Sequence, residues 1–406
     1  MQLPIYLDYA ATTPVDPRVI SCLVQHLSRD GIFGNPSSNT HTFGYKAACA
    51  IEVAREQVAD LLSAKPVEII WTSGATEANN LALCGALRAN LQKGRHLITS
   101  KTEHRAVLDV CRWLEKDGYT VSYLDANPDG LIDLEKLAAA LRPDTVLVSL
   151  MHVNNETGVV QDLAAISTLT QENGVLLHVD ASQSVGKLPI DLQALPIDLL
   201  SLSAHKIYGP KGSGALFVRH CPKRQIHLKP LIHGGGQERG LRAGTLAVHQ
   251  IVATGEACQI AGFEMKEERL RLKKLRNRLL LGLTKLGKIT LNGHPTQNWS
   301  GILNISFAGI TAEALITATP EIAVATGSAC TSANIENSHV LRAMGCSATR
   351  ARGAIRFSVG RFTTNEEVDY TIHVVSAAVR RLRAISPIWE QLCSATHHQV
   401  DWSAPL

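Results

Sequence analysis

The stretch DLLSLSAHKIYGPKGSGALFV, residues 198–218, opens with an apolar run and continues into a glycine-rich segment. The apolar run predicts a buried strand, and Lys206 follows it closely. Lysine is rarely fully buried unless something compensates its charge. We therefore expect that Lys206 either bends out to solvent or meets a specific partner at the end of this strand.

Four more apolar runs of this kind occur upstream, separated by helical patterns. They are EIIWTS (68–73), HLITS (96–100), TVLVSLMHV (145–153) and VLLHVDAS (175–182). Near-continuous apolar strands that alternate with helices predict an α/β fold, with a mostly parallel sheet covered on both faces. In such sheets, ligands bind beyond the carboxyl ends of the strands.

Polar or chemically reactive residues follow all five predicted strands. In chain order they are Thr72 to Thr76, His104, Asn154 and Asn155, Asp180 to Gln183, and Ser203 to Lys206. Because the carboxyl ends of parallel strands meet at one edge of a sheet, we expect these residues to line a single crevice.

The chain length predicts two domains, because 406 residues exceed what one simple core holds. After about residue 262 the pattern changes to a charged amphipathic helix (265–287), two strand-like runs (301–307 and 354–360) and a final helix with one apolar face. We therefore expect a large domain over residues 16–262 and a smaller α+β domain over residues 263–406.

The composition argues against several classes of protein. The chain is 45% hydrophobic and 19% charged with a net charge of +4, which argues against disorder and, without a dense basic block, against nucleic-acid binding. Its nine cysteines are odd in number and lack C-x-x-C spacing, which argues against a zinc site or a disulfide scaffold. No signal-peptide pattern and no apolar run of membrane-span length occur, so we expect a cytoplasmic protein.

The segment TSGATEANN, residues 72–80, has the pattern of a phosphate site. Gly74 permits a tight turn and a helix begins at Ala75 and Thr76, so free backbone N–H groups and the positive end of the helix dipole face outwards. The alternative is an ordinary helix cap that Glu77 completes.

Asp180 ends the apolar run of HVDASQS, where a buried carboxylate is costly without a cation. A protonated pyridine nitrogen is such a cation, and an Asp commonly pairs with the ring nitrogen of pyridoxal phosphate. The alternative is a salt bridge to a neighbouring arginine. Three residues further on, Gln183 is placed to donate a hydrogen bond to the phenolic oxygen of the same ring.

Lys206 is then the residue that binds this aldehyde cofactor. A lysine at a strand end forms a Schiff base with an aldehyde, and desolvation lowers its pKa so that it also moves protons. Ser203 and His205 flank it as donors for a phosphate. The rival is Lys211 in GPKGSG, but that loop lacks the Gly-Lys-Ser/Thr order of a nucleotide-binding loop.

His104 and Cys330 complete the candidate residues. His104 falls in the same crevice, where its ring would stack on a planar cofactor and exchange protons near neutral pH, although a lone histidine is more often structural. Cys330 lies in IAVATGSACTSANIENS (322–338) among small residues, which predicts an exposed loop with a nucleophilic thiolate. We interpret the other eight cysteines as structural or incidental.

With these residues in place, the sequence resembles the cysteine desulfurases, pyridoxal phosphate enzymes of class V of the aminotransferases, and within them the housekeeping branch for iron–sulfur assembly. The resemblance covers nearly the whole chain, through YLDYAATTP, GNPSS, TSGATEANN, TEHRAVLD, MHVNNETG, HVDASQS, SLSAHKIYGPKG, HGGGQERGLRAGT, GSACTS and RFSVGRFTT. It implies an aspartate aminotransferase-like fold with a seven-stranded, mostly parallel sheet. It also implies that residues 1–15 associate with the small domain, which carries the catalytic loop at about residues 325–337.

The resemblance assigns a role to each candidate residue. Lys206 would hold the cofactor and move the substrate's Cα proton, and Cys330 would take the sulfur. The ring would contact His104, Asp180 and Gln183, and the phosphate would contact Ala75, Thr76, Ser203, His205 and, from a second subunit, Thr245. Asn155 and Arg356 would grip the substrate carboxylate, which arginine recognises with a bidentate fork.

The implied reaction converts L-cysteine into L-alanine and a persulfide on Cys330. The implied partners are a second copy of the chain, an iron–sulfur scaffold protein and other sulfur acceptors, with no resident metal, although Cys330 would transiently ligate a cluster together with a partner. Three alternatives stay open. They are an aminotransferase or selenocysteine lyase of the same fold, a non-catalytic scaffold stabilised by the cofactor, and a metal protein that uses His397 and His398.

Overall fold

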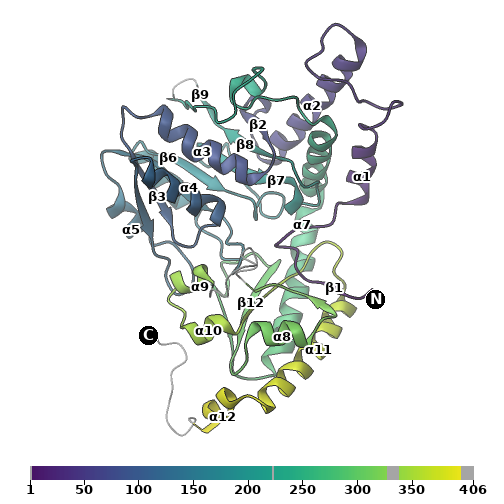
Figure 1. Ribbon diagram of the computed structural model, residues 1–406, viewed down its shortest axis with the longest axis vertical. Helices are drawn as coiled ribbons and strands as arrows, with labels where there is room; N and C mark the ends of the chain where they lie inside the picture. Colours follow the sequence, from purple (N-terminus) through teal and green to yellow (C-terminus); the bar gives the residue numbers. More distant parts are fainter. Residues whose placement is uncertain (1, 222–223, 327–337, 395–406) are drawn as a thin grey trace.

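The computed structural model describes residues 2–221, 224–326 and 338–394. The chain forms a larger α/β unit and a smaller unit below it in Figure 1, and a single long helix, α7, runs through both.

The larger unit is built on a seven-stranded sheet with the order β2-β8-β7-β6-β5-β3-β4. Its strands are β2 (Ile69–Thr72), β3 (His96–Ser100), β4 (Thr120–Leu124), β5 (Thr145–Met151), β6 (Leu176–Asp180), β7 (Leu199–Ser203) and β8 (Gly214–Val218). Only β8 runs antiparallel to its neighbours. The mostly parallel α/β sheet expected from the sequence is therefore confirmed.

Helices cover both faces of this sheet, because successive side chains of each strand point to opposite faces. On one face, α3 (Ala75–Ala89) and α4 (Arg105–Lys116) pack against residues such as Leu97, Leu147 and Leu199. On the other face, α2 (Thr42–Leu61), α6 (Leu163–Glu172) and α7 (Val248–Thr284) pack against residues such as Ile98 and Val148. Two helices lie nearer the periphery, α1 (Pro17–Val24) and α5 (Leu134–Ala140).

The smaller unit is an antiparallel sheet of β11 (Ile289–Leu291), β12 (Ile302–Phe307) and β14 (Ala354–Ser358). Its core includes residues of α7 and of α11 (Asn365–Ala384), and α8 (Ala312–Ala318), α9 (His339–Ala343), α10 (Ala348–Arg352) and α12 (Pro387–Ser394) complete it. The N-terminal β1 (Ile5–Tyr6) pairs in parallel with β13 (Ile322–Ala323), and Asp8 bridges to Ser358. The beginning of the chain therefore lies against this unit.

Helix α7 is 37 residues long and belongs to two hydrophobic cores. Its first half packs into the core of the large sheet through residues such as Ile251, and its second half packs into the small unit through residues such as Leu275. The predicted helix at 265–287 is the second half of α7, and the predicted boundary after residue 262 falls inside it. The division into residues 1–15, 16–262 and 263–406 stays a prediction.

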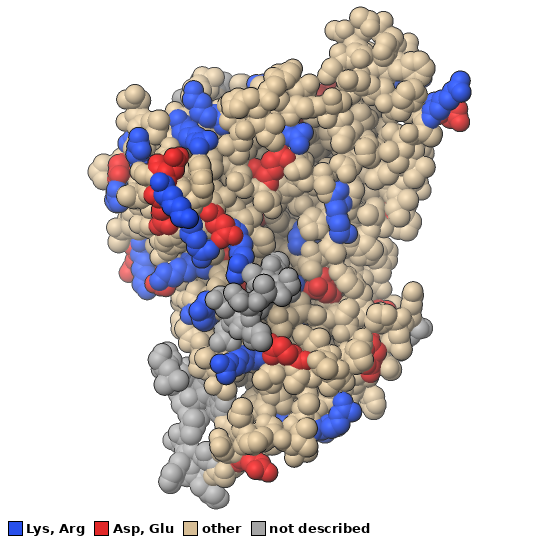
Figure 2. All heavy atoms as spheres, in the orientation of Figure 1, with Lys and Arg blue, Asp and Glu red and all other residues tan. Residues whose placement is uncertain are grey.

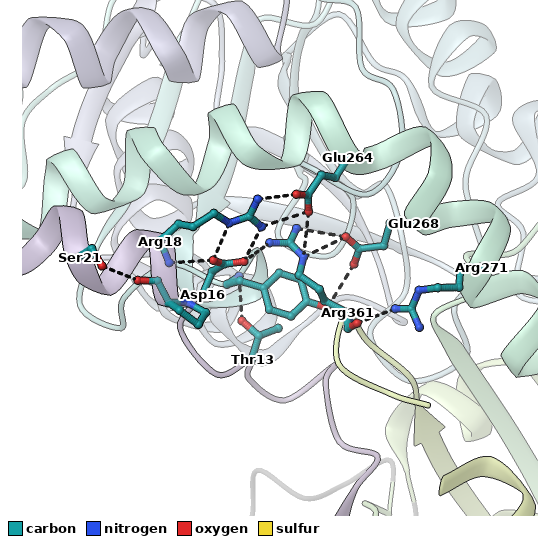
Figure 3. A network of polar contacts seen from close by, with 10 residues as sticks. Thr13, Asp16, Arg18, Ser21, Glu264, Glu268, Arg271 and Arg361 are labelled. Atoms are coloured by element: carbon teal, nitrogen blue, oxygen red, sulfur yellow. Dashed lines mark hydrogen bonds and ion pairs between the residues drawn. The ribbon is translucent and has the colours of Figure 1, made fainter. Parts of the chain in front are cut away.

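A network of charged groups joins the N-terminal segment, α7 and the turn after β14 (Figure 3). Arg361 donates to Asp16 at 2.8 Å and to Glu268 at 3.1 Å, while Arg18 binds Asp16 at 2.8 Å and also Glu264. The two arginines hold the pKa of Asp16 well below its usual range. This network ties the two units together close to the carboxyl end of β7, because Arg361 N also donates to Tyr208 Oη at 2.6 Å.

The surface carries interspersed charges. On the face shown in Figure 2, basic and acidic side chains lie next to one another. Exposed ion pairs such as Lys101 with Asp125 at 2.7 Å are of this kind. Among the described residues, no helix is both long enough and apolar enough to cross a membrane.

Candidate active site

Lys206 lies on the short 3-10 helix η2 (Ala204–Lys206) that directly follows β7. Its Nζ atom donates hydrogen bonds to the carbonyl oxygens of Ala10 and Ala11, both at 2.7 Å. Of the two expected environments, the structure shows contact with protein, because the N-terminal segment supplies these two acceptors. These bonds hold the amine at the carboxyl edge of the sheet rather than in bulk solvent.

Asp180 is the last residue of β6 and is buried. Asn79 Nδ2 donates to its Oδ2 at 2.8 Å, and the backbone N–H and hydroxyl of Ser182 donate to its Oδ1 at 3.0 and 2.5 Å. Within the described part of the chain no basic side chain forms an ion pair with it, so the alternative of an arginine salt bridge is not observed. A buried carboxylate held only by neutral donors fits a cationic group such as a pyridinium nitrogen.

His104 is the N-cap of α4, and its Nδ1 accepts from Ala106 N at 3.1 Å. Burial lowers the pKa of His104, Asp180 opposes this shift and Lys206 reinforces it. His104 is thus within electrostatic reach of both residues and is neutral at pH 7. A neutral ring that accepts at Nδ1 carries its proton on Nε2, and its flat face suits stacking on a planar cofactor.

Gln183 is buried in the turn after β6. Its Nε2 donates to Ala10 O at 2.8 Å, the same carbonyl that accepts from Lys206. Its Oε1 accepts from Lys187 Nζ at 2.9 Å. The N–H end of the Gln183 amide and the Lys206 amine therefore meet at the same acceptor, the carbonyl oxygen of Ala10.

The residues predicted for the phosphate lie around the start of α3. Gly74 precedes Ala75 with φ of 147°, a conformation that favours glycine, and no side chain caps the first turn of the helix. A Cβ atom on Gly74 would lie 3.6 Å from Ser203 Oγ, so this hydroxyl faces the start of the helix. Glu77 instead binds Ser73 N at 2.8 Å, so a cap is formed beside the open N–H groups.

Two further residues predicted for the phosphate differ in exposure. Thr76 is exposed in the first turn of α3, whereas His205 is half-buried and its Nδ1 lies 3.1 Å from Thr12 Oγ1. Burial, together with neighbouring lysines led by Lys206, lowers the pKa of His205 to about 4. His205 is therefore a neutral hydrogen-bonding group, and an anion at this site takes its positive potential from the helix terminus.

The residues predicted for the substrate carboxylate lie where the two units meet. Arg356 on β14 donates through Nη1 to Asn155 O and through Nη2 to Asp8 Oδ1, both at 2.8 Å. Arg356 Nε and Asn155 Oδ1 are buried without a partner among the described residues. Buried polar groups are rarely left unpaired, so the Nε donor of Arg356 fits an acceptor such as a carboxylate, whereas Oδ1 of Asn155 fits a donor.

Some predicted residues lie apart from this cluster or outside the described residues. Thr245 is exposed just before α7, and in the described part of the chain its side chain forms no hydrogen bond with the cluster. Cys330, His397 and His398 lie outside the described residues. In the ranges that are described, no group of three or more His, Cys, Asp or Glu residues is placed to hold a metal.

The sequence analysis missed three residues that contact the cluster, namely Asn79, Asp8 and Lys187. Asn79 lies in TEANN, four residues after the helix start, so helical spacing would have placed it on the inward face of α3. Asp8 lies in YLDYAATTP, far along the chain from the residues that it meets. Lys187 lies four residues after Gln183, a spacing that brings the two side chains together because the chain turns between them.

Comparison with known proteins shows which family the chain belongs to. Residues 5–371 match the family model described as aminotransferase class-V. The chain belongs to the class-V aminotransferase family. Enzymes of this family use pyridoxal 5'-phosphate, and this member is likewise a pyridoxal phosphate-dependent enzyme.

Several class-V relatives match over the full chain. The protein named cysteine desulfurase IscS of Proteus mirabilis is 56% identical over 404 residues, which cover 99% of this chain and all of that protein. The protein of the same name from Klebsiella pneumoniae is 54% identical over the same shares. A solved structure titled NifS-like protein is 37% identical with a TM-score of 0.86, and it covers 93% of this chain and 99% of that one.

Proposed function

We propose that the protein is a cysteine desulfurase that converts L-cysteine into L-alanine and leaves the sulfur as a persulfide on Cys330. The buried carboxylate of Asp180, held only by neutral donors in the described structure, carries this proposal because it fits the cationic ring of pyridoxal phosphate. The relatives named cysteine desulfurase support the reaction class. A structure titled SspA in complex with cysteine, 39% identical with a TM-score of 0.79, supports the substrate.

Residues of the large unit would hold the cofactor. Asp180 would pair with its ring nitrogen, His104 would stack on the ring, and Gln183 would donate to its phenolic oxygen. The start of α3 with Ser203 would hold the phosphate, together with Ala75, Thr76 and His205. When bound, pyridoxal phosphate supplies an electron sink for the charge left at the substrate's Cα after its proton departs.

The remaining steps fall to the protein's own side chains. Lys206 would take the Cα proton at Nζ, while Arg356 and Asn155 orient the substrate through its carboxylate. The Cys330 thiolate would attack the substrate's sulfur, and the bond between that sulfur and Cβ would break. Cβ would keep the electron pair of that bond and take up a proton, Lys206 would return the Cα proton, alanine would leave, and the sulfur would remain on Cys330 as a persulfide.

A second copy of the chain is part of this proposal. Apolar and aromatic side chains of α1, of the segment after it and of the first turn of α2 are each at least 48% exposed: Ile20, Val24, Leu27, Phe33, Phe43 and Tyr45. Such a large exposed apolar area supports a protein interface. A dimer across it would let Thr245 contact the phosphate of the partner subunit.

We further propose a cytoplasmic enzyme whose acceptors are an iron–sulfur scaffold protein and other thiol-bearing proteins. A persulfide donates sulfur only to another nucleophilic thiol or to a partner that assembles clusters, so the product requires such partners. An aminotransferase does not need Cys330, and the relatives' names do not favour a selenocysteine lyase.

The deciding experiment is peptide mass spectrometry after mixing the purified holoenzyme with L-cysteine in the absence of reductant. We expect an added sulfur atom on the Cys330 peptide, with alanine formed in equal amount. The Cys330→Ser variant should keep the cofactor colour and bind cysteine, yet release no sulfide. If the Cys330 peptide stayed unmodified while the cofactor still reacted with cysteine, the assignment would change to an aminotransferase or lyase.

A further inference from the structure

Lys187 is a lysine beside the candidate active site to which the reaction assigns no role. It is half-buried and lines a cavity between the two units with Gln183, Glu268 and Arg361. Its Nζ donates to Gln183 Oε1 at 2.9 Å, which is a neutral acceptor. Glu268, the carboxylate whose charge acts on Lys187, is already paired with Arg361 at 3.1 Å.

The contacts with Lys187 and with Ala10 O together decide which way the Gln183 amide points. An amide side chain has one accepting and one donating end, and an ammonium group donates only. Because Lys187 donates to Oε1, the opposite end of the amide must be the Nε2 donor. That donor points to Ala10 O at 2.8 Å, where Lys206 Nζ also binds.

Lys187 also affects the charge around Lys206. Burial lowers the pKa of Lys187 to about 7, and Lys206 and Arg356 act in the same direction as like charges, whereas Glu268 opposes them. The interaction is mutual, so a protonated Lys187 disfavours a proton on Lys206. Lys187 likewise contributes to the lowered pKa of His205.

We propose that Lys187 is a positioning residue for the reaction. Its ammonium group fixes the amide of Gln183 with Nε2 directed towards Lys206, and it places a positive charge beside the Lys206 amine. The inference rests on the proposed function, because Gln183 then presents its N–H to the phenolic oxygen of the cofactor. Without Lys187, only Ala10 O holds the orientation of the amide, and Lys206 retains its proton to a higher pH.

The test compares Lys187→Met with the wild-type full-length protein by two measurements. The first uses cofactor-free protein and follows, by mass spectrometry, how fast a small acylating reagent modifies Lys206 as a function of pH. We expect modification at pH 6, where Lys187 carries its proton, to be about 3- to 10-fold slower in the variant, which corresponds to a rise of half to one unit in the Lys206 pKa. The second follows the pH midpoint of the cofactor's colour change in the holoenzyme, which should rise by the same amount.

Two control variants separate positioning from general effects. Lys187→Arg keeps a cationic donor and should retain midpoints close to wild type. Lys285→Met removes an exposed lysine at the C-terminal end of α7, whose charge is screened by water, and should leave both midpoints unchanged. If Lys187→Met does not fold by its melting curve, Lys187→Gln replaces it in both measurements.

Unchanged midpoints in a folded Lys187 variant would overturn the inference, even if turnover fell, because a merely structural role would lower turnover without moving them. Failure of the proposed function looks different. In that case the wild-type holoenzyme forms no persulfide on Cys330, while the modification rate of Lys206 in cofactor-free protein still tests the effect of Lys187.

Discussion

Replacement of Glu238 by alanine should be among the most destabilising single changes in the glycine-rich segment that precedes α7. Both carboxylate oxygens of Glu238 accept from the Arg55 guanidinium at 2.9 Å, and Oε2 also accepts from Trp71 N at 2.8 Å. The side chains of Glu238 and Arg55 are only 3% and 11% exposed. This pair attaches the segment with Thr245 to the edge strand β2.

The size of the destabilisation follows from the groups that lose their partner when alanine replaces Glu238. Removing one partner of a buried ion pair costs about 3–5 kcal/mol when the other charge stays buried without compensation. Arg55 would keep its ion pair with Glu52 at 3.2 Å and its bond to Ile69 O at 2.8 Å, so this contribution lies at the lower end of that range. The Trp71 N–H also loses its acceptor, which by itself costs about 1–3 kcal/mol. Since the same carboxylate serves both groups, the costs overlap, and we expect a loss of about 3–5 kcal/mol in the free energy of unfolding.

The assay is reversible urea unfolding at a fixed protomer concentration, because an oligomer's stability depends on concentration. Asp369→Ala is the matched control, since Arg278 binds Asp369 with the same bidentate geometry, at 2.5 and 2.7 Å, but on the surface. That variant should unfold close to wild type. Equal losses in Glu238→Ala and Asp369→Ala would refute the argument from burial.

Three other outcomes are expected. Lys206→Ala should lose the yellow cofactor on gel filtration, and retained colour that borohydride fixes to Lys211 would contradict the assignment. Asp180→Asn should keep bound cofactor but form alanine about 10²- to 10³-fold more slowly, the usual loss when a key electrostatic group is removed; a rate within threefold of wild type would oppose its role. Burial lowers the pKa values of His152 and His178 to about 4. Between pH 6.5 and pH 4 the unfolded chain therefore binds more protons than the folded chain, and the free energy of unfolding should fall as the pH drops through that range. A urea midpoint that is the same at pH 7.5 and pH 4.5 would count against this.

The large sheet could be predicted because its strands are buried on both faces and therefore form continuous apolar runs. All five predicted runs contain observed strands. Strand β4 was not predicted, because it is an edge strand whose residues are mostly half-exposed and its polar residues interrupt the apolar run. The pattern also missed the first half of α7, where buried residues occur all round the helix and leave no amphipathic stripe.

The active-site candidates could be predicted to the extent that they follow strand ends. Asp180 and Lys206 stand at the ends of β6 and β7, and the topology of a parallel sheet brings such positions together. Their partners could not be predicted in this way. Asn79 and Lys187 lie at local spacings of four residues, in a helix and in a turn, but which side chains they meet depends on packing, and the carbonyl of Ala10 reaches the cluster from far along the chain.

Helix α7 has a consequence for how the molecule unfolds. The helix supplies side chains to the core of the large sheet and to that of the small unit, with no loop between the two halves. Loss of either core would expose half of the same helix, so the two units are expected to melt in one calorimetric transition rather than two. For the same reason, the small unit can move during turnover only if α7 bends. Bending of α7 would therefore couple substrate binding to the rest of the chain.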